Sequence, residues 1–173
     1  MILKLIGSAM VLISASILGI AYSREFSKRP QQLRALQGLL QLLENDISFL
    51  SSILSDAFER LYRCSSSEVS VFFMDAAKNL RSLSGMNASE AWEISVRNNM
   101  SKTSLSREDE QILISFGKML GNSDLEGQLK NIRLAVSQLK LQEQKAEEQK
   151  RKNEAMYRSL GFLGGLAIVI LLV

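Results

Sequence analysis

The sequence contains no histidine and only one cysteine, Cys64. Serine–histidine and cysteine–histidine catalysis are therefore excluded, as are zinc sites that use histidine. A single cysteine also excludes an intrachain disulfide and all-cysteine zinc sites, and it fits a reducing compartment. We expect Cys64 at the surface end of a helix or in a gap of the core. We expect neither a catalytic site nor a cofactor or metal, and hence no enzyme.

Proline is equally scarce, and β-branched residues never alternate with polar ones over a strand length, so an all-α fold is expected. The one proline, Pro30, is expected at the first position of a helix. Leucines and isoleucines then recur at steps of three and four: Leu33, Leu36, Leu40, Leu43, Ile47, Leu50 and Leu54, with Leu39 and Leu42 widening the stripe. The pattern predicts one core-facing helix, or a helix pair broken around Ser51 and Ser52.

Start and stop signals divide the rest of the domain into short helices. The expected starts are Ser55-Asp56, Ser65 with Glu68, Asn87 with Glu90, Ser106 with Asp109, and Ser123 with Glu126. Gly85 and Gly121 are expected to end helices. Together these signals predict a six-helix bundle over residues 30–140.

The sixth helix changes character along its length. Its first half carries a stripe suited to the bundle: Leu125, Leu129, Ile132, Val136 and Leu139. After Leu141 charged and amide residues leave no apolar face, so we expect a solvated stalk over 141–158 that stands off from the core. The alternative, pairing with the neck after Tyr22, is limited because that neck is short.

Both ends of the chain are apolar. Ile2–Tyr22 carries only Lys4, and its length favours a retained anchor over a cleaved signal. Leu160–Val173 carries no charge, but its helix would rise only about 21 Å against a hydrocarbon core of about 30 Å. We expect transmembrane segments at 1–23 and 159–173 that enclose a cytoplasmic bundle at 24–140.

Basic residues flank both apolar ends and set this topology: Arg24, Lys28, Arg29, Lys150, Arg151, Lys152 and Arg158. Residues 34–143 hold 12 Lys and Arg against 14 Asp and Glu, whereas the two necks, residues 23–33 and 144–158, are net positive. We therefore expect contact with membrane lipid and no binding of nucleic acid. Small residues one turn apart, Ala15 with Gly19 and Gly161 with Gly165, predict helix packing within the membrane.

The most distinctive local pattern spans residues 116–128. Gly117 is expected to let another helix approach closely, and Gly121 to adopt a left-handed C-cap. The segment is interpreted as a structural turn or a partner-docking site, carried by Phe116, Gly117, Leu120, Gly121, Asp124 and Gln128. Trp92 is interpreted as a core residue or a surface anchor. Gly117-Lys118 is not a phosphate-binding loop, because Ile112 and Met119 replace the residues that loop requires.

Several stretches resemble the stage III sporulation protein AB family of endospore-forming bacteria. They are the Leu3–Gly7 anchor start, the Lys28–Arg34 neck, Ala91-Trp92, the Phe116–Asp124 turn, and Tyr157–Gly165. The resemblance implies a mother-cell protein of the outer forespore membrane, within a secretion-like channel or feeding-tube complex. It implies a soluble domain similar to platform proteins of type II secretion and type IV pilus systems, docking a cytoplasmic ATPase and other channel subunits. Self-association stays open, and the alternative is a signalling adaptor that transmits conformational change through the stalk.

Overall fold

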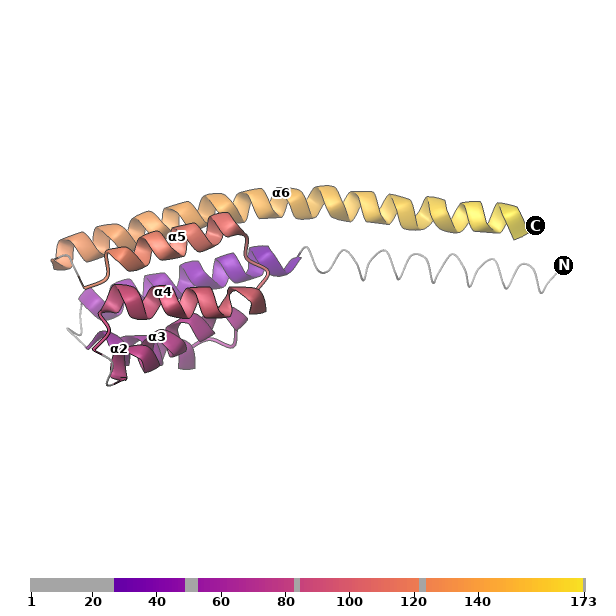
Figure 1. Cartoon of the computed structure of the whole chain (residues 1–173). Coiled ribbons are helices and arrows are strands. Elements are labelled where there is room, and N and C mark those ends of the chain that lie inside the picture. The colour runs from indigo at the N-terminus through magenta and orange to yellow at the C-terminus, as the bar shows by residue number, and fades with distance from the viewer. Residues whose placement is uncertain (1–26, 49–52, 83–84, 122–123, 173) are drawn as a thin grey trace. The chain divides into compact units, whose positions relative to one another are not determined.

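The computed structural model describes residues 27–48, 53–82, 85–121 and 124–172; beyond Glu154 it describes the side chains of Met156, Ser159 and Leu163 only. Within these ranges the fold is all-helical, with six α-helices and no strand (Figure 1). The helices span 27–48, α2 Leu54–Arg63, α3 Val71–Arg81, α4 Ala88–Asn99, α5 Arg107–Lys118 and α6 Leu125–Leu172, with 3₁₀ turns η1 Glu68–Ser70 and η2 Met100–Lys102. The chain divides into two compact units, Gln31–Gln144 and Met1–Pro30 with Lys145–Val173.

The leucine stripe belongs to two helices, as the second of our two interpretations predicted. The first is described as far as residue 48, residues 49–52 lie outside the described residues, and α2 begins at Leu54 after the extended N-cap residue Ile53, which forms no side-chain cap. The start predicted at Ser55-Asp56 is therefore wrong, since both residues already lie in the first turn of α2. Cys64 lies exposed at the C-cap of α2, at a surface end as expected.

The apolar stripe of the first helix is narrower than its leucines suggested. Its buried members are Leu33, Leu36, Leu39, Leu40 and Leu43. Leu42 is 45% exposed because it lies to the side of the packed face. The expected position of Pro30 is also wrong, since residues 27–29 before it are already helical.

One aromatic side chain from each of four consecutive helices meets in the core of the Gln31–Gln144 unit. They are Phe58 of α2, Phe73 of α3, Trp92 of α4 and Phe116 of α5, all buried. The Trp92 ring lies 5.4, 5.0 and 5.3 Å from those of Phe58, Phe73 and Phe116. Tilted and edge-on pairs at these distances contribute beyond the area they bury. Trp92 is thus a core residue that joins all four helices.

Two of the predicted capping boxes form. Asn87 and Glu90 exchange side-chain and backbone hydrogen bonds at the start of α4, and Ser106 and Asp109 do so at the start of α5. The buried carboxylate of Asp109 accepts from the Ser106 N–H at 2.8 Å. Burial of this acid therefore serves a helix start, where an acid also complements the helix dipole.

The start predicted at Ser65 with Glu68 is wrong. Ser65 accepts a hydrogen bond from the N–H of Ser67 rather than Glu68, and η1 separates it from α3. The start predicted at Ser123 with Glu126 is not tested, since Ser123 lies outside the described residues; at α6 the Asp124 carboxylate accepts from the Gly127 N–H at 3.0 Å.

Buried polar side chains tie the short helices together. Gln32, 5% exposed, donates to the Glu68 carboxylate at 2.6 Å and accepts from the Ser104 N–H at 2.7 Å. Ser95 of α4 donates to the Phe72 carbonyl of α3 at 2.6 Å. Throughout the described residues, no buried side-chain nitrogen or oxygen lacks a partner. Satisfied groups of this kind fix a single arrangement of helices, because leaving one unpaired is costly.

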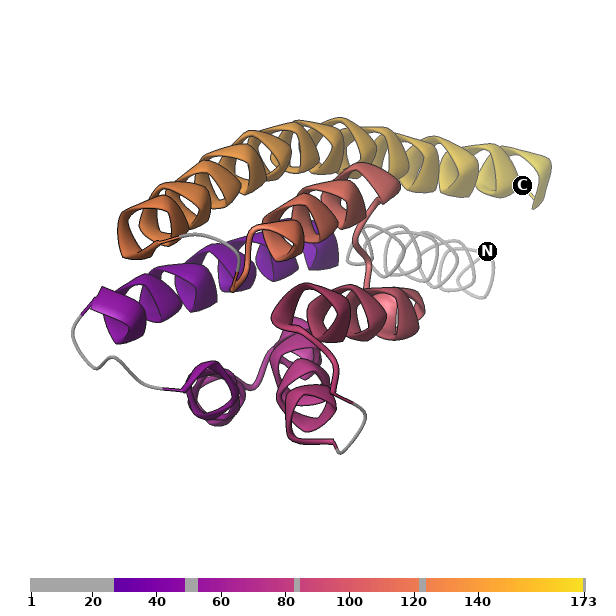
Figure 2. The ribbon, with the colours of Figure 1, turned by 60° about the vertical axis from the view of Figure 1, so that its left-hand side comes forward.

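The first part of α6 packs beside α5 and the first helix (Figure 2). Its buried residues are Ile132, Ala135 and Leu139, whereas Leu125 of the predicted stripe is 53% exposed. Arg133 bonds Glu44 at 2.6 Å, and Glu143 accepts from Arg34 at 2.6 Å and from Gln37 at 2.7 Å. The stalk therefore does not stand off from Leu141 onward, since Glu143 still bonds the first helix.

Glu143 illustrates why the pairing of α6 with the first helix is favourable. Burial raises the pKa of its carboxyl, but the hydrogen bonds from Gln37 and Arg34 outweigh that effect and hold the pKa below its usual value. The ionised form is thus stabilised by its neighbours on the first helix.

In the other unit, α6 continues without interruption to Leu172. Arg29 donates to the Gln149 side chain at 3.4 Å, and Ala146 is 3% exposed. Pairing with the neck, which the sequence allowed as an alternative, thus occurs at Gln149. No helix within the described residues has the combined length and apolarity to span a membrane; the segment predicted at 1–23 lies outside them.

The contrast between the two serine starts gives a first test. Ser106→Ala removes a capping-box acceptor and should lower the free energy of unfolding by about 1 kcal/mol. Ser65→Ala, which removes only a local turn bond, should cost less than half as much. Urea unfolding of the full chain followed by circular dichroism measures both. Equal losses would contradict the assignment of the two serines.

Candidate functional site

The segment over 116–121 and 124–128, here called the α5–α6 turn, is positioned by a contact between Trp92 and Gly117. A Cβ atom on Gly117 would lie 2.3 Å from Cδ1 of the Trp92 ring. The missing side chain lets the indole Nε1 donate to the Leu113 carbonyl at 2.8 Å. Leu113 lies one helical turn before Gly117, so the same face of α5 supplies the space and the acceptor. The close approach expected at Gly117 is made by α4.

The end of α5 is closed by tight backbone bonds. The N–H groups of Met119 and Leu120 donate to the carbonyls of Phe116 and Gly117 at 3.2 and 3.0 Å. Gly121 has φ +77°, the left-handed conformation predicted for it, which glycine adopts without the strain of a side chain. A Cβ there would also lie 3.3 Å from Cβ of Ala88, at the start of α4.

Asn131 completes the turn from α6 and was not identified from the sequence. Its side-chain amide donates to the Phe116 carbonyl at 3.0 Å, as a second donor beside the Met119 N–H, and so ties α6 to the end of α5. The available signal was an asparagine within a long helix, where its side chain is unfavourable unless it has a role.

The six residues predicted at this turn divide into an inner and an outer set. Phe116, Gly117 and Leu120 are buried, Gln128 is half-buried, and Gly121 and Asp124 are exposed. The inner set belongs to the core and cannot contact a partner directly.

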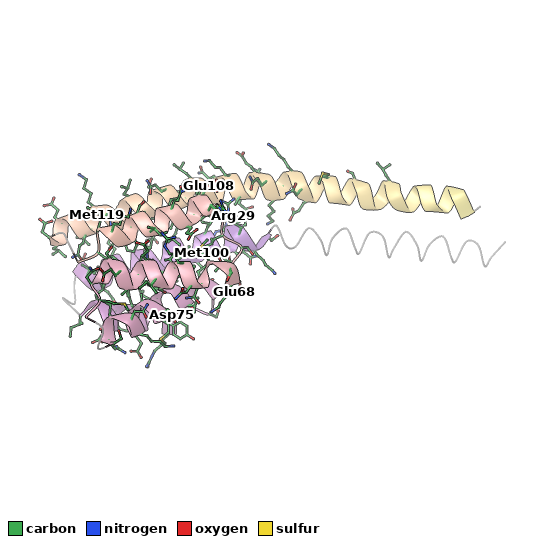
Figure 3. The ribbon with its side chains drawn as sticks, viewed as in Figure 1. Arg29, Glu68, Asp75, Met100, Glu108 and Met119 are labelled. Carbon is green, nitrogen blue, oxygen red and sulfur yellow. The ribbon has the colours of Figure 1, made fainter. Side chains whose placement is uncertain are left out.

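The turn nevertheless presents apolar surface, at residues the sequence did not single out. Met119 is 46% exposed at the end of α5 (Figure 3), and Leu125 is 53% exposed at the start of α6. Exposed Lys118 and Asp124 lie beside them in the chain. Exposed apolar side chains with charged neighbours suit the binding of another protein.

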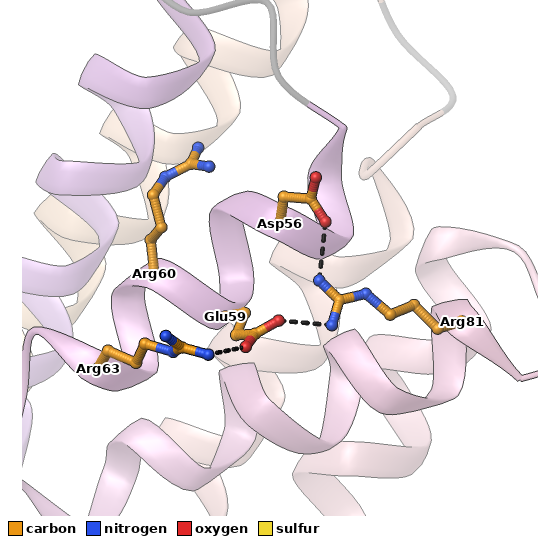
Figure 4. A pocket seen from close by; sticks show the side chains of 5 residues that line it. All are labelled: Asp56, Glu59, Arg60, Arg63 and Arg81. Atoms are coloured by element: carbon orange, nitrogen blue, oxygen red, sulfur yellow. Dashed lines mark hydrogen bonds and ion pairs between the residues drawn. The ribbon is translucent and has the colours of Figure 1, made fainter.

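A second cluster lines a surface pocket between α2 and α3: Asp56, Glu59, Arg60, Arg63 and Arg81 (Figure 4). Arg81 of α3 bonds Asp56 at 2.7 Å and also Glu59, while Arg63 bonds Glu59 from within α2. Hydrogen bonds from Arg81, opposed by partial desolvation, hold the pKa values of Asp56 and Glu59 below their usual range. Arg60 extends the network to Asp46 of the first helix at 3.0 Å.

This cluster is interpreted as a brace between helices. Each carboxylate of the pocket already bonds an arginine, and with Asp46 included three carboxylates neutralise three arginines. Glu108, Asp109 and Glu110 occupy the first turn of α5, and no group of three or more possible metal ligands occurs among the described residues.

The residues predicted at the membrane interface lie partly within the described ranges. Lys28, Arg151 and Lys152 are exposed, whereas Arg29 and Lys150 are half-buried. Gly161 and Gly165 lie in α6, as does the backbone of Arg158. Arg24, Ala15 and Gly19 lie outside the described residues. Packing of the membrane segments therefore stays a prediction.

Gly117→Ala tests the contact with Trp92. Overpacking costs about 1–3 kcal/mol, and loss of the indole hydrogen bond about 1 kcal/mol more. Better helix propensity offsets about 1 kcal/mol, so we expect a net loss of about 1–3 kcal/mol in urea unfolding. Gly38→Ala is the matched control, since Gly38 has nothing within 4 Å of an added Cβ. It should stabilise the chain, and a stable Gly117→Ala variant would refute the contact.

Arg81→Gln tests the brace through its pH dependence. Because the folded-state pKa values of Asp56 and Glu59 are lowered, their contribution to stability is present above the unfolded-state values, near 3.8 and 4.5. It is lost as pH falls through the lowered folded values. The stability difference between wild type and Arg81→Gln should therefore shrink between about pH 5 and pH 3. A difference that is unchanged at pH 3 would argue against the brace; Lys130→Gln controls for loss of one charge.

Comparison with known proteins identifies relatives over nearly the whole chain. The family model described as stage III sporulation protein AB matches residues 4–173. Stage III sporulation protein AB of Bacillus subtilis (strain 168) is 34% identical over 170 residues, covering 98% of this chain and 99% of the relative.

A solved structure supports the same relationship. The structure of a stage III sporulation protein AB superimposes with a TM-score of 0.68 at 30% identity, covering 72% of this chain and 98% of the other. Sequence and fold therefore agree, and the chain belongs to the stage III sporulation protein AB family.

Proposed function

We propose that this chain is a non-enzymatic membrane platform component of the mother cell–forespore channel complex, and that it docks a cytoplasmic secretion-type ATPase to the membrane. The observation that carries the proposal is the family match over residues 4–173. Its family is named for stage III of sporulation, and the match leaves almost no part of the chain unaccounted for.

A non-enzymatic role is supported by what the polar side chains do. Asp109 starts a helix, Gln32 joins three segments, and Arg81 braces α2 against α3. These groups are engaged in holding the fold, and the sequence has no histidine to act as a general base near neutral pH.

Membrane anchoring is supported by the sequence at both ends. Ile2–Tyr22 is apolar with one lysine, and Leu160–Val173 is uncharged. Basic residues lie on the inner side of both segments, which favours retention of the intervening bundle in the cytoplasm. By family resemblance the membrane is the outer of the two around the forespore, on the mother-cell side.

Docking at the α5–α6 turn is supported by the exposed pair Met119 and Leu125 on a base fixed by Trp92. The bonds at Gly117 and Asn131 hold the end of α5, so a partner would meet a preformed surface. Preformed surfaces bind with a smaller loss of conformational entropy.

Substitution of the exposed pair tests the docking surface. The full chain, co-expressed with the secretion-type ATPase of the same complex, is solubilised and captured, and the recovered ATPase is measured. Met119→Glu with Leu125→Glu should reduce the ATPase at least about tenfold, because charge is placed in an apolar contact. Leu134→Glu with Leu141→Glu is the matched control, since these leucines are 56% and 57% exposed elsewhere on α6.

Two outcomes would count against this site. ATPase recovery that is unchanged in the Met119 and Leu125 variant would exclude the turn as the docking surface. An equal loss in the Leu134 and Leu141 control would instead indicate that the docking surface lies on α6 around these two leucines. Circular dichroism checks that both variants are folded.

A further inference from the structure

The unit formed by Met1–Pro30 and Lys145–Val173 carries a cluster of cations from two distant segments. Lys28 and Arg29 come from the start of the first helix, and Lys150, Arg151 and Lys152 come from α6; we call these five residues the basic collar. We propose that the basic collar binds the phosphate headgroups of anionic phospholipids. The inference rests on the proposed membrane anchoring and adds a lipid preference to it.

The first support is the contact that brings the two segments together. Arg29 donates to the Gln149 side chain at 3.4 Å, across 120 residues of sequence. Gln149 immediately precedes the Lys150–Lys152 run on α6. The cations of the two segments therefore lie near the contact between Arg29 and Gln149.

The second support is exposure. Lys28, Arg151 and Lys152 are exposed, and the ion pair of Lys150 with Glu147 is long, at 3.8 Å. An exposed guanidinium such as that of Arg151 can bond a phosphate through two N–H groups, and a lysine can neutralise its charge.

The third support is the distribution of charge along the chain. The sequence over 34–143 is net negative, with 12 basic and 14 acidic residues, whereas each neck is net positive. Beyond the necks the sequence becomes apolar at Ile2–Tyr22 and Leu160–Val173. Cations next to membrane segments meet the headgroup layer, where they attract anionic lipid. A lipid surface therefore fits this collar better than a nucleic acid or an acidic protein.

Lipid retention by the full chain tests the collar. The protein, purified in nonionic detergent, is incubated with mixed micelles containing equal amounts of phosphatidylglycerol and phosphatidylcholine. Retained lipid is then quantified by mass spectrometry. We expect phosphatidylglycerol to be preferred at least about tenfold in 50 mM salt and much less in 500 mM salt, because salt screens the attraction.

A triple substitution and a matched control locate the effect. Lys28→Gln with Arg151→Gln and Lys152→Gln should reduce the preference by up to about fivefold per cation, so that a tenfold preference falls to near equality. Lys78→Gln with Arg107→Gln and Lys130→Gln removes the same number and kind of exposed charges from the Gln31–Gln144 unit. This control should keep the preference of the wild type.

Three outcomes would overturn the inference. They are no preference in the wild type, a preference that survives the collar substitutions, and an equal loss in the control. Alkaline carbonate extraction of cell membranes separates this failure from that of the proposed function. A chain that stays in the membrane without a lipid preference refutes the collar alone, whereas a chain released into the soluble fraction refutes the anchoring and the collar together.

Discussion

The approach of Trp92 to Gly117 is the constraint on which the bundle depends. A large ring can lie against α5 only where α5 has no side chain, and it then reaches the Leu113 carbonyl. The same ring meets Phe58, Phe73 and Phe116, so one residue fixes the relative positions of α2, α3, α4 and α5. Dispersion and aromatic contacts hold these helices close, and the single hydrogen bond fixes the orientation of the indole.

Polar contacts then select one arrangement among those that apolar packing would allow. Gln32 bonds both Glu68 and the Ser104 backbone, and Glu143 bonds both Arg34 and Gln37. Each pair joins parts of the sequence that lie far apart, and each would leave polar groups unpaired if the helices shifted by one turn. The α5–α6 turn is fixed in the same way, because contacts within the bundle hold both of its flanking helices.

The sequence predicted local features well and non-local ones poorly. The capping boxes at Asn87 and Ser106 depend only on residues three positions apart, and both form. The box at Ser65 fails because the Glu68 carboxylate bonds Gln32, 36 residues away. The glycine at 117 predicted a close approach, but nothing in its neighbourhood identified Trp92 as the group that approaches. The exposure of Leu42 and Leu125 could likewise not be predicted from the sequence, because the partner helices set the width of a buried stripe.

Trp92 is also the only tryptophan in the chain, and it is fully buried. Its fluorescence therefore arises from one site, in contact with aromatic rings of three other helices. A partner that displaced α5 through the α5–α6 turn would change the environment of the indole and with it the emission spectrum. Trp92 fluorescence can therefore report movement of α5 without an attached dye.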